Sequence, residues 1–302
     1  MKKAIEYGLS DLYVSIDGAN STELRVEQNT FISELDALAK NTSTQIHVRQ
    51  SLVNLGIAVS IISGLDWIAS NENSFLVFED DLEINHDFFF FAENMLDVFA
   101  QNDDVVMISG NRFTPLESND FSISWTNYSQ TWGWATWSEK WKVLREEAIS
   151  SHSRSVSFSL NKVKNFWHFG TRRVQSGYID TWDIPISAFM YKQGKLCLLP
   201  PVNLVKNIGF DTFSTHTVKP VFPMNYETMK LPESFKLLAP THLVLEEMNA
   251  FLQSSVFRIP RRASFLPIYY FLHSLIRRRS RVPNLVKRLG NLRKSDFLFL
   301  SF

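Results

Sequence analysis

The stretch Phe75-Leu76-Val77-Phe78-Glu79-Asp80-Asp81-Leu82-Glu83 is an apolar run that ends in clustered carboxylates. Each anion in such a cluster makes its neighbours harder to ionise, so a buried strand rarely ends this way without a reason. Carboxylates at the carboxyl end of a strand suit a hard divalent cation, Mn²⁺ or Mg²⁺, and the phosphates that it carries. The stretch therefore predicts a strand of an α/β fold with a metal site at its end. A solvated acidic loop that caps the following helix is the alternative.

The residues around this stretch alternate between strand and helix patterns. Alternation at this spacing predicts an α/β protein with a mixed, mainly parallel sheet flanked by helices. Residues 1–9 resemble the end of a helix, so the opening strand of such a fold has no counterpart; either the domain is abbreviated or the chain begins late. We expect strands at 11–16, 45–49 and 105–110, helices at about 21–40, 57–70, 88–100 and 178–193, and an extended segment at 195–205.

Length and composition are those of an ordinary globular protein. The 302 residues suit one large domain with an appendage, or two small ones, and 45% of them are hydrophobic. The single cysteine, Cys197, excludes an intrachain disulfide framework and fits a reducing compartment. The amino terminus does not resemble a signal peptide, and no apolar run is long enough to span a bilayer. These features predict a cytoplasmic protein, either soluble or peripheral on the inner face of the plasma membrane.

The neutral net charge hides a basic tail. Residues 258–302 hold eleven of the 31 Lys and Arg residues but one of the 31 acids, which leaves 20 bases and 30 acids in the rest of the chain. Basic and aromatic residues alternate in this tail, as in helices that lie on anionic membranes. We expect 221–302 to form a basic helical extension that binds such a surface or packs on the acidic body. No nucleic-acid-binding motif accompanies the charge.

The acidic stretch also resembles a known motif. Residues 78–83, followed by Asp87-Phe88-Phe89, are similar to the Glu-Asp-Asp-Leu-Glu and Asp-Phe-Phe motifs of the N-acetylglucosaminyltransferase I family and of related bacterial sugar transferases with the GT-A fold. Further segments match in the family's order, so that the resemblance covers about residues 10–220. These segments are Thr131-Trp132-Gly133-Trp134-Ala135-Thr136-Trp137, Thr181-Trp182-Asp183, residues 203–210 and Thr215-His216-Thr217.

The resemblance implies roles for the acidic residues around a nucleoside-diphosphate sugar, the donor. Asp81 would bind the metal, and Glu79 and Asp80 would contact the donor sugar and ribose. Asp17, at the end of its strand, would contact the uracil base, although Asp17-Gly18 is equally an ordinary turn signal.

Asp183 is the candidate general base. An inverting glycosyl transfer needs a carboxylate to take the proton of the acceptor hydroxyl while the diphosphate leaves from the opposite face of the sugar. Trp182-Asp183 matches the family's Trp-Asp at that place in the chain. Asp180 could substitute if the match slips by three residues. Asp183 could also simply begin a helix, because Asp is a favoured cap and Pro185 suits a first turn.

Two further segments are expected to contact the donor. Gly133 lets the backbone approach a ligand closely, and the indole rings of Trp132 and Trp134 can stack on a sugar, although any single Trp could equally belong to the core. Residues 209–217 correspond to a segment that closes over the donor in the resembling family and excludes water. Within it, His216 could hydrogen-bond a diphosphate oxygen.

Together these features predict a metal-dependent glycosyltransferase domain at 1–220. The resemblance implies a UDP-sugar donor, a saccharide or lipid-linked saccharide acceptor, and a setting in bacterial surface polysaccharide or lipopolysaccharide assembly. A sugar-nucleotide nucleotidyltransferase and a non-catalytic sugar-nucleotide-binding protein remain alternatives. The sugar, the acceptor and the linkage do not follow from the sequence.

Overall fold

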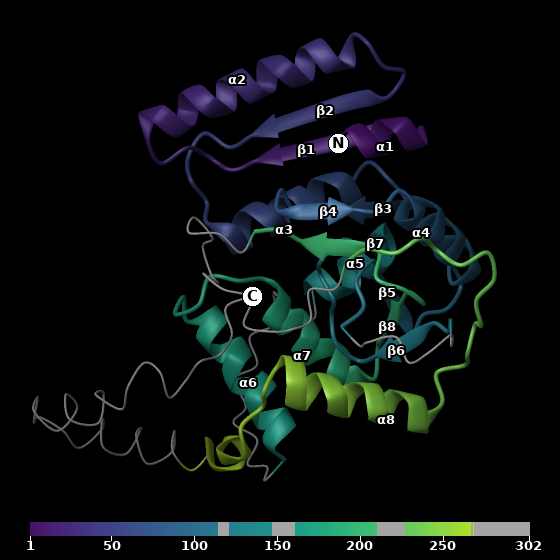
Figure 1. Cartoon of the computed structure of the whole chain (residues 1–302). Helices are drawn as coiled ribbons and strands as arrows, with labels where there is room; N and C mark the ends of the chain where they lie inside the picture. Colours follow the sequence, from purple (N-terminus) through teal and green to yellow (C-terminus); the bar gives the residue numbers. More distant parts are fainter. Residues whose placement is uncertain (114–120, 147–160, 210–226, 267, 269–302) are drawn as a thin grey trace, which may run out of the picture.

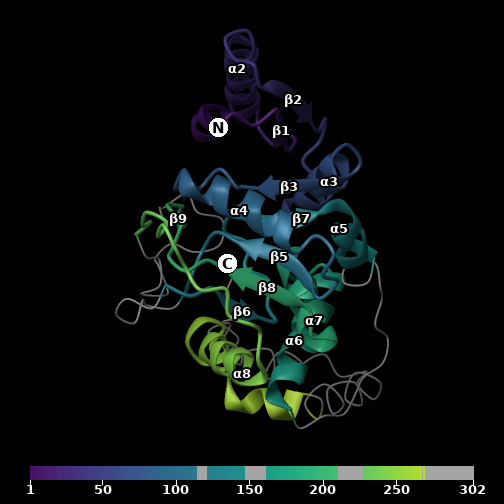
Figure 2. The same ribbon diagram turned by 90° about the vertical axis from the view of Figure 1, so that its right-hand side faces the viewer.

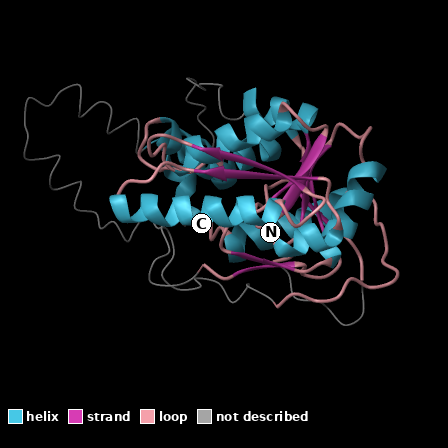
Figure 3. Cartoon of the chain, turned by 90° about the horizontal axis from the view of Figure 1, so that it is seen from above, coloured by secondary structure: helices cyan, strands magenta, loops and turns pink. Residues whose placement is uncertain are grey.

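The computed structural model describes residues 1–113, 121–146, 161–209, 227–266 and 268. Helices flank a set of short strands that belong to three sheets (Figures 1 and 3). The chain is thus an α/β protein, as expected, and the expected strands and helices in its first third lie close to their predicted positions.

The central sheet has five strands, and its strand order follows from the pairings. Strands lie in the order β3 (Ser74–Val77), β7 (Trp134–Trp137), β5 (Val105–Ser109), β8 (Leu196–Leu199) and β6 (Ser124–Thr126). Only β5 and β8 pair in parallel; the other three pairs are antiparallel. The expectation of a mainly parallel sheet is therefore wrong for these strands. Both β6 and β7 lie in a Trp-rich part of the chain where the sequence pattern predicts no strand.

The tryptophan spacing around β7 is not typical of a strand. Trp134, Trp137 and Trp141 are three and four residues apart, which is the spacing of a helix face. In the structure Trp134 and Trp137 are the two ends of β7, and α5 (Ser138–Leu144), which carries Trp141, begins directly afterwards. A strand followed at once by a helix thus imitates a longer helical pattern.

Helices cover both faces of the central sheet (Figure 2). On one face, α4 (Asp87–Val98) packs against side chains of β5, β6 and β8, together with α8 (His242–Phe251). On the other face lie α3 (Ile57–Ala69), α5 and α7 (Asp183–Gln193). Trp134, Trp141 and Trp182 meet in this second layer, and the rings of Trp134 and Trp182 stack with centroids 5.6 Å apart.

The helix α6 (Lys162–Gln175) was not expected from the sequence. Asn161 caps its first turn by accepting hydrogen bonds from the backbone N–H groups of Val163 and Lys164. Its apolar side packs on α7 and on a third cluster of buried side chains near the carboxyl end of the described chain. This helix therefore supports α7 from the side away from the sheet.

The amino-terminal layer is a separate, thinner part of the fold. It consists of α1 (Lys2–Tyr7), β1 (Asp11–Ile16), α2 (Thr22–Ala39) and β2 (Gln45–Gln50), and β1 and β2 pair in parallel. No residue of either strand is fully buried. Within the described ranges, β1 pairs with β2 alone and β3 with β7 alone, so each strand has one unpaired edge.

The third sheet joins the acidic stretch to a distant segment. Strand β4 (Leu82–Ile84) follows the acidic turn directly and pairs antiparallel with β9 (Val205–Asn207). This pairing places the end of β9 beside Asp81 and so contributes to the site described below.

Residues after 226 are partly integrated into the main domain. Lys236 forms a bridge with Ser122, the indole N–H of Trp125 donates to the carbonyl of Leu238, and α8 packs on β6. Most of the expected basic extension, including its arginine cluster at 277–281, lies outside the described residues. No helix in the described part of the chain is both long and apolar enough to cross a membrane.

Candidate active site

The acidic stretch ends its strand where the sequence suggested. β3 stops at Val77, and residues 78–81 form a turn that leads into β4. Asp81 is half-buried in this turn, whereas Glu79 and Asp80 are exposed. The turn therefore presents one sheltered carboxylate and two that face solvent.

Asp81 is held from the side of β9. The side chain of Asn207 donates a hydrogen bond from Nδ2 to Oδ2 of Asp81 over 3.1 Å, and the backbone N–H of Ile208 donates to the Asp81 carbonyl. Gly209 approaches so closely that a Cβ atom there would lie 2.5 Å from Asp81 Oδ2. Burial raises the pKa of Asp81, while the hydrogen bond from Asn207 opposes that rise. A cation bound there would also oppose it.

The charges around Glu79 show which acids lie near one another. Burial of Glu79 among protein atoms and the negative charges of Asp81, Asp183 and Asp80, in that order, raise its pKa to about 7. By surface area the side chain is exposed, so water screens part of this repulsion. Asp183 therefore lies within electrostatic range of the acidic turn. Residues about 100 positions apart in the sequence thus converge.

Asp183 is the first residue of α7. The hydroxyl of Thr181 donates to its Oδ1, and the hydroxyl of Ser129 donates to its backbone carbonyl over 3.5 Å. The carboxylate is therefore held at the start of a supported helix. This agrees with the alternative that Asp183 begins a helix. That role is compatible with the role of a base.

Asp180, the alternative base, has a structural task. Its Oδ2 and Oδ1 accept hydrogen bonds from the backbone N–H groups of Ile57 (2.9 Å) and Ala58 (3.0 Å), the first two residues of α3. Gly56 makes this contact possible, because a Cβ there would lie 2.7 Å from Asp180 Oδ2 and its φ is +78°. Asp180 thus caps α3, and of the two acids Asp183 is the one that lies near the acidic turn.

Asp17 also binds backbone. Its carboxylate accepts hydrogen bonds from the N–H groups of Gly18 (2.7 Å), Leu55 (2.9 Å) and Gly56 (3.2 Å). These contacts tie the end of β1 to the loop before α3. Contact with a nucleotide base stays a prediction for this residue.

In the tryptophan segment, Trp132 lines a recess whereas Trp134 belongs to the core. Trp134 is 0% exposed and stacked on Trp182, so its predicted contact with a sugar is wrong. Gly133 is buried with φ +62°, and a Cβ there would lie 2.8 Å from a methyl group of Val205; its close approach is to the core rather than to a ligand. Trp132 is half-buried and lines a recess beside Asp183. His216 lies outside the described residues.

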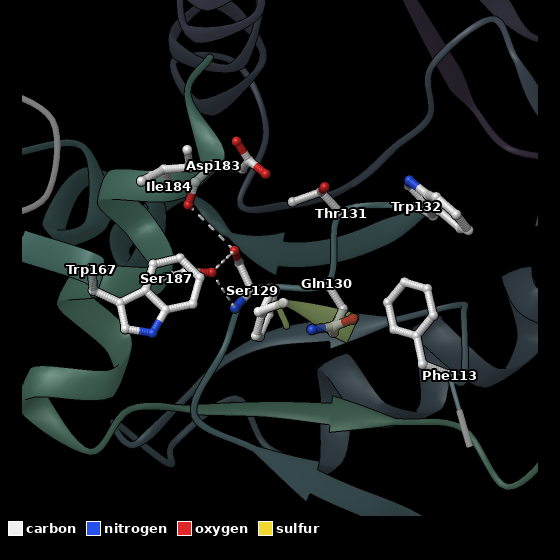
Figure 4. A pocket seen from close by; sticks show the side chains of 10 residues that line it. Phe113, Ser129, Gln130, Thr131, Trp132, Trp167, Asp183, Ile184 and Ser187 are labelled. Carbon is white, nitrogen blue, oxygen red and sulfur yellow. Dashed lines mark hydrogen bonds between the residues drawn. The ribbon is translucent and has the colours of Figure 1, made fainter. Parts of the chain in front are cut away.

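The recess adjoins the candidate base (Figure 4). Its volume is ≈ 370 Å³ including its open mouth. Its walls combine aromatic rings with polar side chains near the start of α7. The residues that line it are Phe113, Ser129, Gln130, Thr131, Trp132, Trp167, Asp183, Ile184, Ser187 and Phe257.

The donor groups present fit a hard divalent cation that shares its coordination with a ligand. In the described part of the chain, no three His, Cys, Asp or Glu side chains are arranged to hold a metal by themselves. Mg²⁺ is commonly held by one or two carboxylates plus waters and substrate phosphates, and Asp81 supplies one sheltered carboxylate. A role for Mn²⁺ or Mg²⁺ is therefore compatible with the residues present.

Sequence reasoning assigned no role to three residues of this site. They are Asn207, which holds Asp81, Thr181, which donates to Asp183, and Gln130, which lines the recess. Of the three, only Asn207 has a sequence signal that could have indicated its role, because it lies at the end of an apolar segment. Comparison with models of known protein families and with curated proteins found no match.

Proposed function

We propose that the chain is a metal-dependent glycosyltransferase that moves a sugar from a nucleoside-diphosphate donor, UDP in the first instance, to a saccharide or lipid-linked acceptor. The observation that carries the proposal is the convergence of the acidic turn with Asp183. A transferase needs a carboxylate for the phosphate-bound cation and a second carboxylate for the acceptor hydroxyl. The resemblance of residues 10–220 to the N-acetylglucosaminyltransferase I family supports the same assignment.

Asp81 would hold Mn²⁺ or Mg²⁺, with Asn207 fixing its carboxylate. A bound cation would neutralise charge that develops on the diphosphate leaving group. Asp183 would accept the proton of the attacking acceptor hydroxyl, and the hydrogen bond from Thr181 to its Oδ1 would help to orient the carboxylate. The new bond joins the acceptor oxygen to the anomeric carbon while the bond to the diphosphate oxygen breaks, and attack from the opposite face inverts the centre.

Two other functions remain as alternatives. A sugar-nucleotide nucleotidyltransferase would consume a nucleoside triphosphate, and a non-catalytic binding protein would bind the donor without turnover. The Thr181–Asp183 contact favours the transferase, because a binding protein does not need an oriented base.

Calorimetric titration with UDP, with and without Mn²⁺, tests the proposal. The wild-type chain should bind UDP in a Mn²⁺-dependent manner, and Asp81→Ala should lose that dependence. Asp36→Ala, which removes an exposed carboxylate on α2, is the matched control and should bind as wild type does. Metal-independent binding, or equal binding by Asp81→Ala, contradicts the proposed site. Release of pyrophosphate from UTP and a sugar phosphate would instead identify the nucleotidyltransferase.

A further inference from the structure

The recess beside Asp183 contains a buried amide whose oxygen has no hydrogen-bond partner among the residues that the structure describes. Gln130 is 2% exposed, and its Oε1 makes no hydrogen bond within the described residues. Figure 4 shows this amide between Ser129 and the rings of Phe113 and Trp132. An unsatisfied buried carbonyl is destabilising, so such a group usually has a compensating task.

The two serine hydroxyls of the recess are already engaged with each other. Ser129 and Ser187 share a hydrogen bond of 2.6 Å between their hydroxyls, and the backbone N–H of Ser129 donates to Ser187 Oγ. Two buried polar atoms of the lining have no partner within the described residues, Gln130 Oε1 and the indole N–H of Trp167, so a ligand hydroxyl that enters the recess could donate to the first and accept from the second. Because rotation about the last side-chain bond exchanges its oxygen and nitrogen, the amide can present either atom.

The size of the recess limits what can enter it. The space in it that a water-sized group can occupy measures ≈ 20 Å³, which is room for a water molecule or for a group of similar size. A pyranose ring does not fit there, but a hydroxymethyl group does. Phe113, Trp167 and Phe257 supply an apolar wall for the methylene, and the amide is available for the hydroxyl. The ring would remain at the mouth, beside Trp132 and Asp183.

We propose that this recess is the acceptor subsite, that it receives the hydroxymethyl arm of a hexose, and that Gln130 selects this arm by hydrogen-bonding its hydroxyl. The inference rests on the proposed function, since it makes the bound hexose the acceptor. It adds the substrate class: an acceptor sugar that carries an exocyclic hydroxymethyl group, rather than a pentose.

Matched pairs of methyl glycosides test this selection. Methyl β-D-glucopyranoside and methyl β-D-xylopyranoside differ only in the hydroxymethyl group, as do methyl β-D-galactopyranoside and methyl α-L-arabinopyranoside. Their affinities for the wild-type chain are measured by NMR titration. We expect at least one hexoside to bind about tenfold more tightly than its matched pentoside, since a site that pairs a hydroxyl rejects the analogue without it. Equal binding within both pairs, or no binding of any of the four, overturns the inference.

Variants of Gln130 identify the residue responsible. Gln130→Met keeps the volume but removes the hydrogen bond, and it should abolish the preference within a pair; Gln130→Glu keeps an acceptor and should retain it. Gln101→Met, at an exposed position after α4, is the control and should behave as wild type does. A preference that survives in Gln130→Met contradicts the assignment. The wild-type comparison does not depend on whether any variant folds.

The UDP titration separates the two proposals. If UDP fails to bind while the hexoside preference holds, the donor assignment is wrong and the recess remains a sugar site. If UDP binds as proposed while the pairs bind equally, the inference about the recess is wrong and the donor site stands.

Discussion

Asn207 donates a hydrogen bond of 3.1 Å to the carboxylate of Asp81, which lies 126 residues earlier in the chain. The pairing of β4 with β9 brings the two together, with Asn207 opposite Leu82 in the register. Asp81 is thus fixed by an element that the sequence separates widely from the acidic turn. This relationship yields the first prediction.

Asn207→Leu should weaken Mn²⁺-dependent UDP binding by about tenfold or more, because residues that orient a metal ligand typically contribute 10- to 100-fold to affinity. The measurement is calorimetric titration of Mn²⁺ and UDP. Asn94→Leu, at an exposed position on α4, makes the same chemical change and should leave binding unaltered. Unchanged affinity in Asn207→Leu would show that Asp81 needs no support from β9.

Asp180 and Asp183 should be separable by substitution. Asp183→Asn should reduce sugar transfer by about 10²- to 10⁴-fold, the range typical of a lost general base, with UDP affinity retained. Asp180→Ala should instead lower the free energy of unfolding by about 1 kcal/mol, because α3 loses its cap. Transfer assays and denaturant titrations of both variants decide the matter. A loss of transfer confined to Asp180→Ala would reverse the assignment.

Lys140 should be a stabilising residue despite its position on a surface helix. Its ammonium donates to the backbone carbonyls of Phe99, Asn102 and Val105, each over 2.9 Å, and lies 3.3 Å from the ring centroid of Trp137. Lys140→Met should therefore lower the free energy of unfolding by about 2 kcal/mol. Lys142→Met breaks only an exposed ion pair and should change it by less than about 0.5 kcal/mol. Similar effects of the two substitutions in urea titrations would refute this account.

The free energy of unfolding should decrease in acid because of His168. Burial, followed by the charges of Arg172 and Lys192, lowers the pKa of His168 below its ordinary value, and its Nε2 has no partner within the described residues. The folded state therefore favours the neutral ring. This contribution is present above pH 6.5, the ordinary pKa of histidine in an unfolded chain, and is lost as the pH falls through the lower pKa of the folded state.

As the pH falls through this range, the free energy of unfolding of wild type should decrease relative to that of His168→Gln, measured by denaturant titration at each pH. His242→Gln removes a histidine whose side chain is 86% exposed and serves as the control for the general effect of acid. A wild-type curve parallel to that of His168→Gln would exclude His168 as the cause.

The elements predicted best are those in which local pattern and tertiary setting agree. β1, α2, β2 and α3 each have a regular apolar period and clear ends, such as Ser21, whose side chain accepts from the N–H of Leu24. The strand that ends in the acidic turn was recognised because clustered carboxylates have few structural explanations. These local signals need no knowledge of distant residues.

The errors come from contacts that the linear sequence does not contain. Whether Trp132 or Trp134 faces a ligand depends on Trp182, which covers Trp134 from another helix. The direction of β7 depends on its insertion between β3 and β5, which residue spacing cannot show. Likewise, Asp180 and Asp183 have the same chemistry, and only the position of the α3 amino terminus separates a cap from a candidate base.

The edges of β1 and β3 that pair with no strand in the described part of the chain have a consequence for the behaviour of the protein in solution. An open strand edge presents free backbone donors and acceptors to any other extended chain. The two strands of the amino-terminal layer bury no side chain completely, so little free energy opposes their rearrangement. We therefore expect self-association at high concentration to begin at this layer, through intermolecular strand pairing, while the five-stranded sheet and its helices remain native.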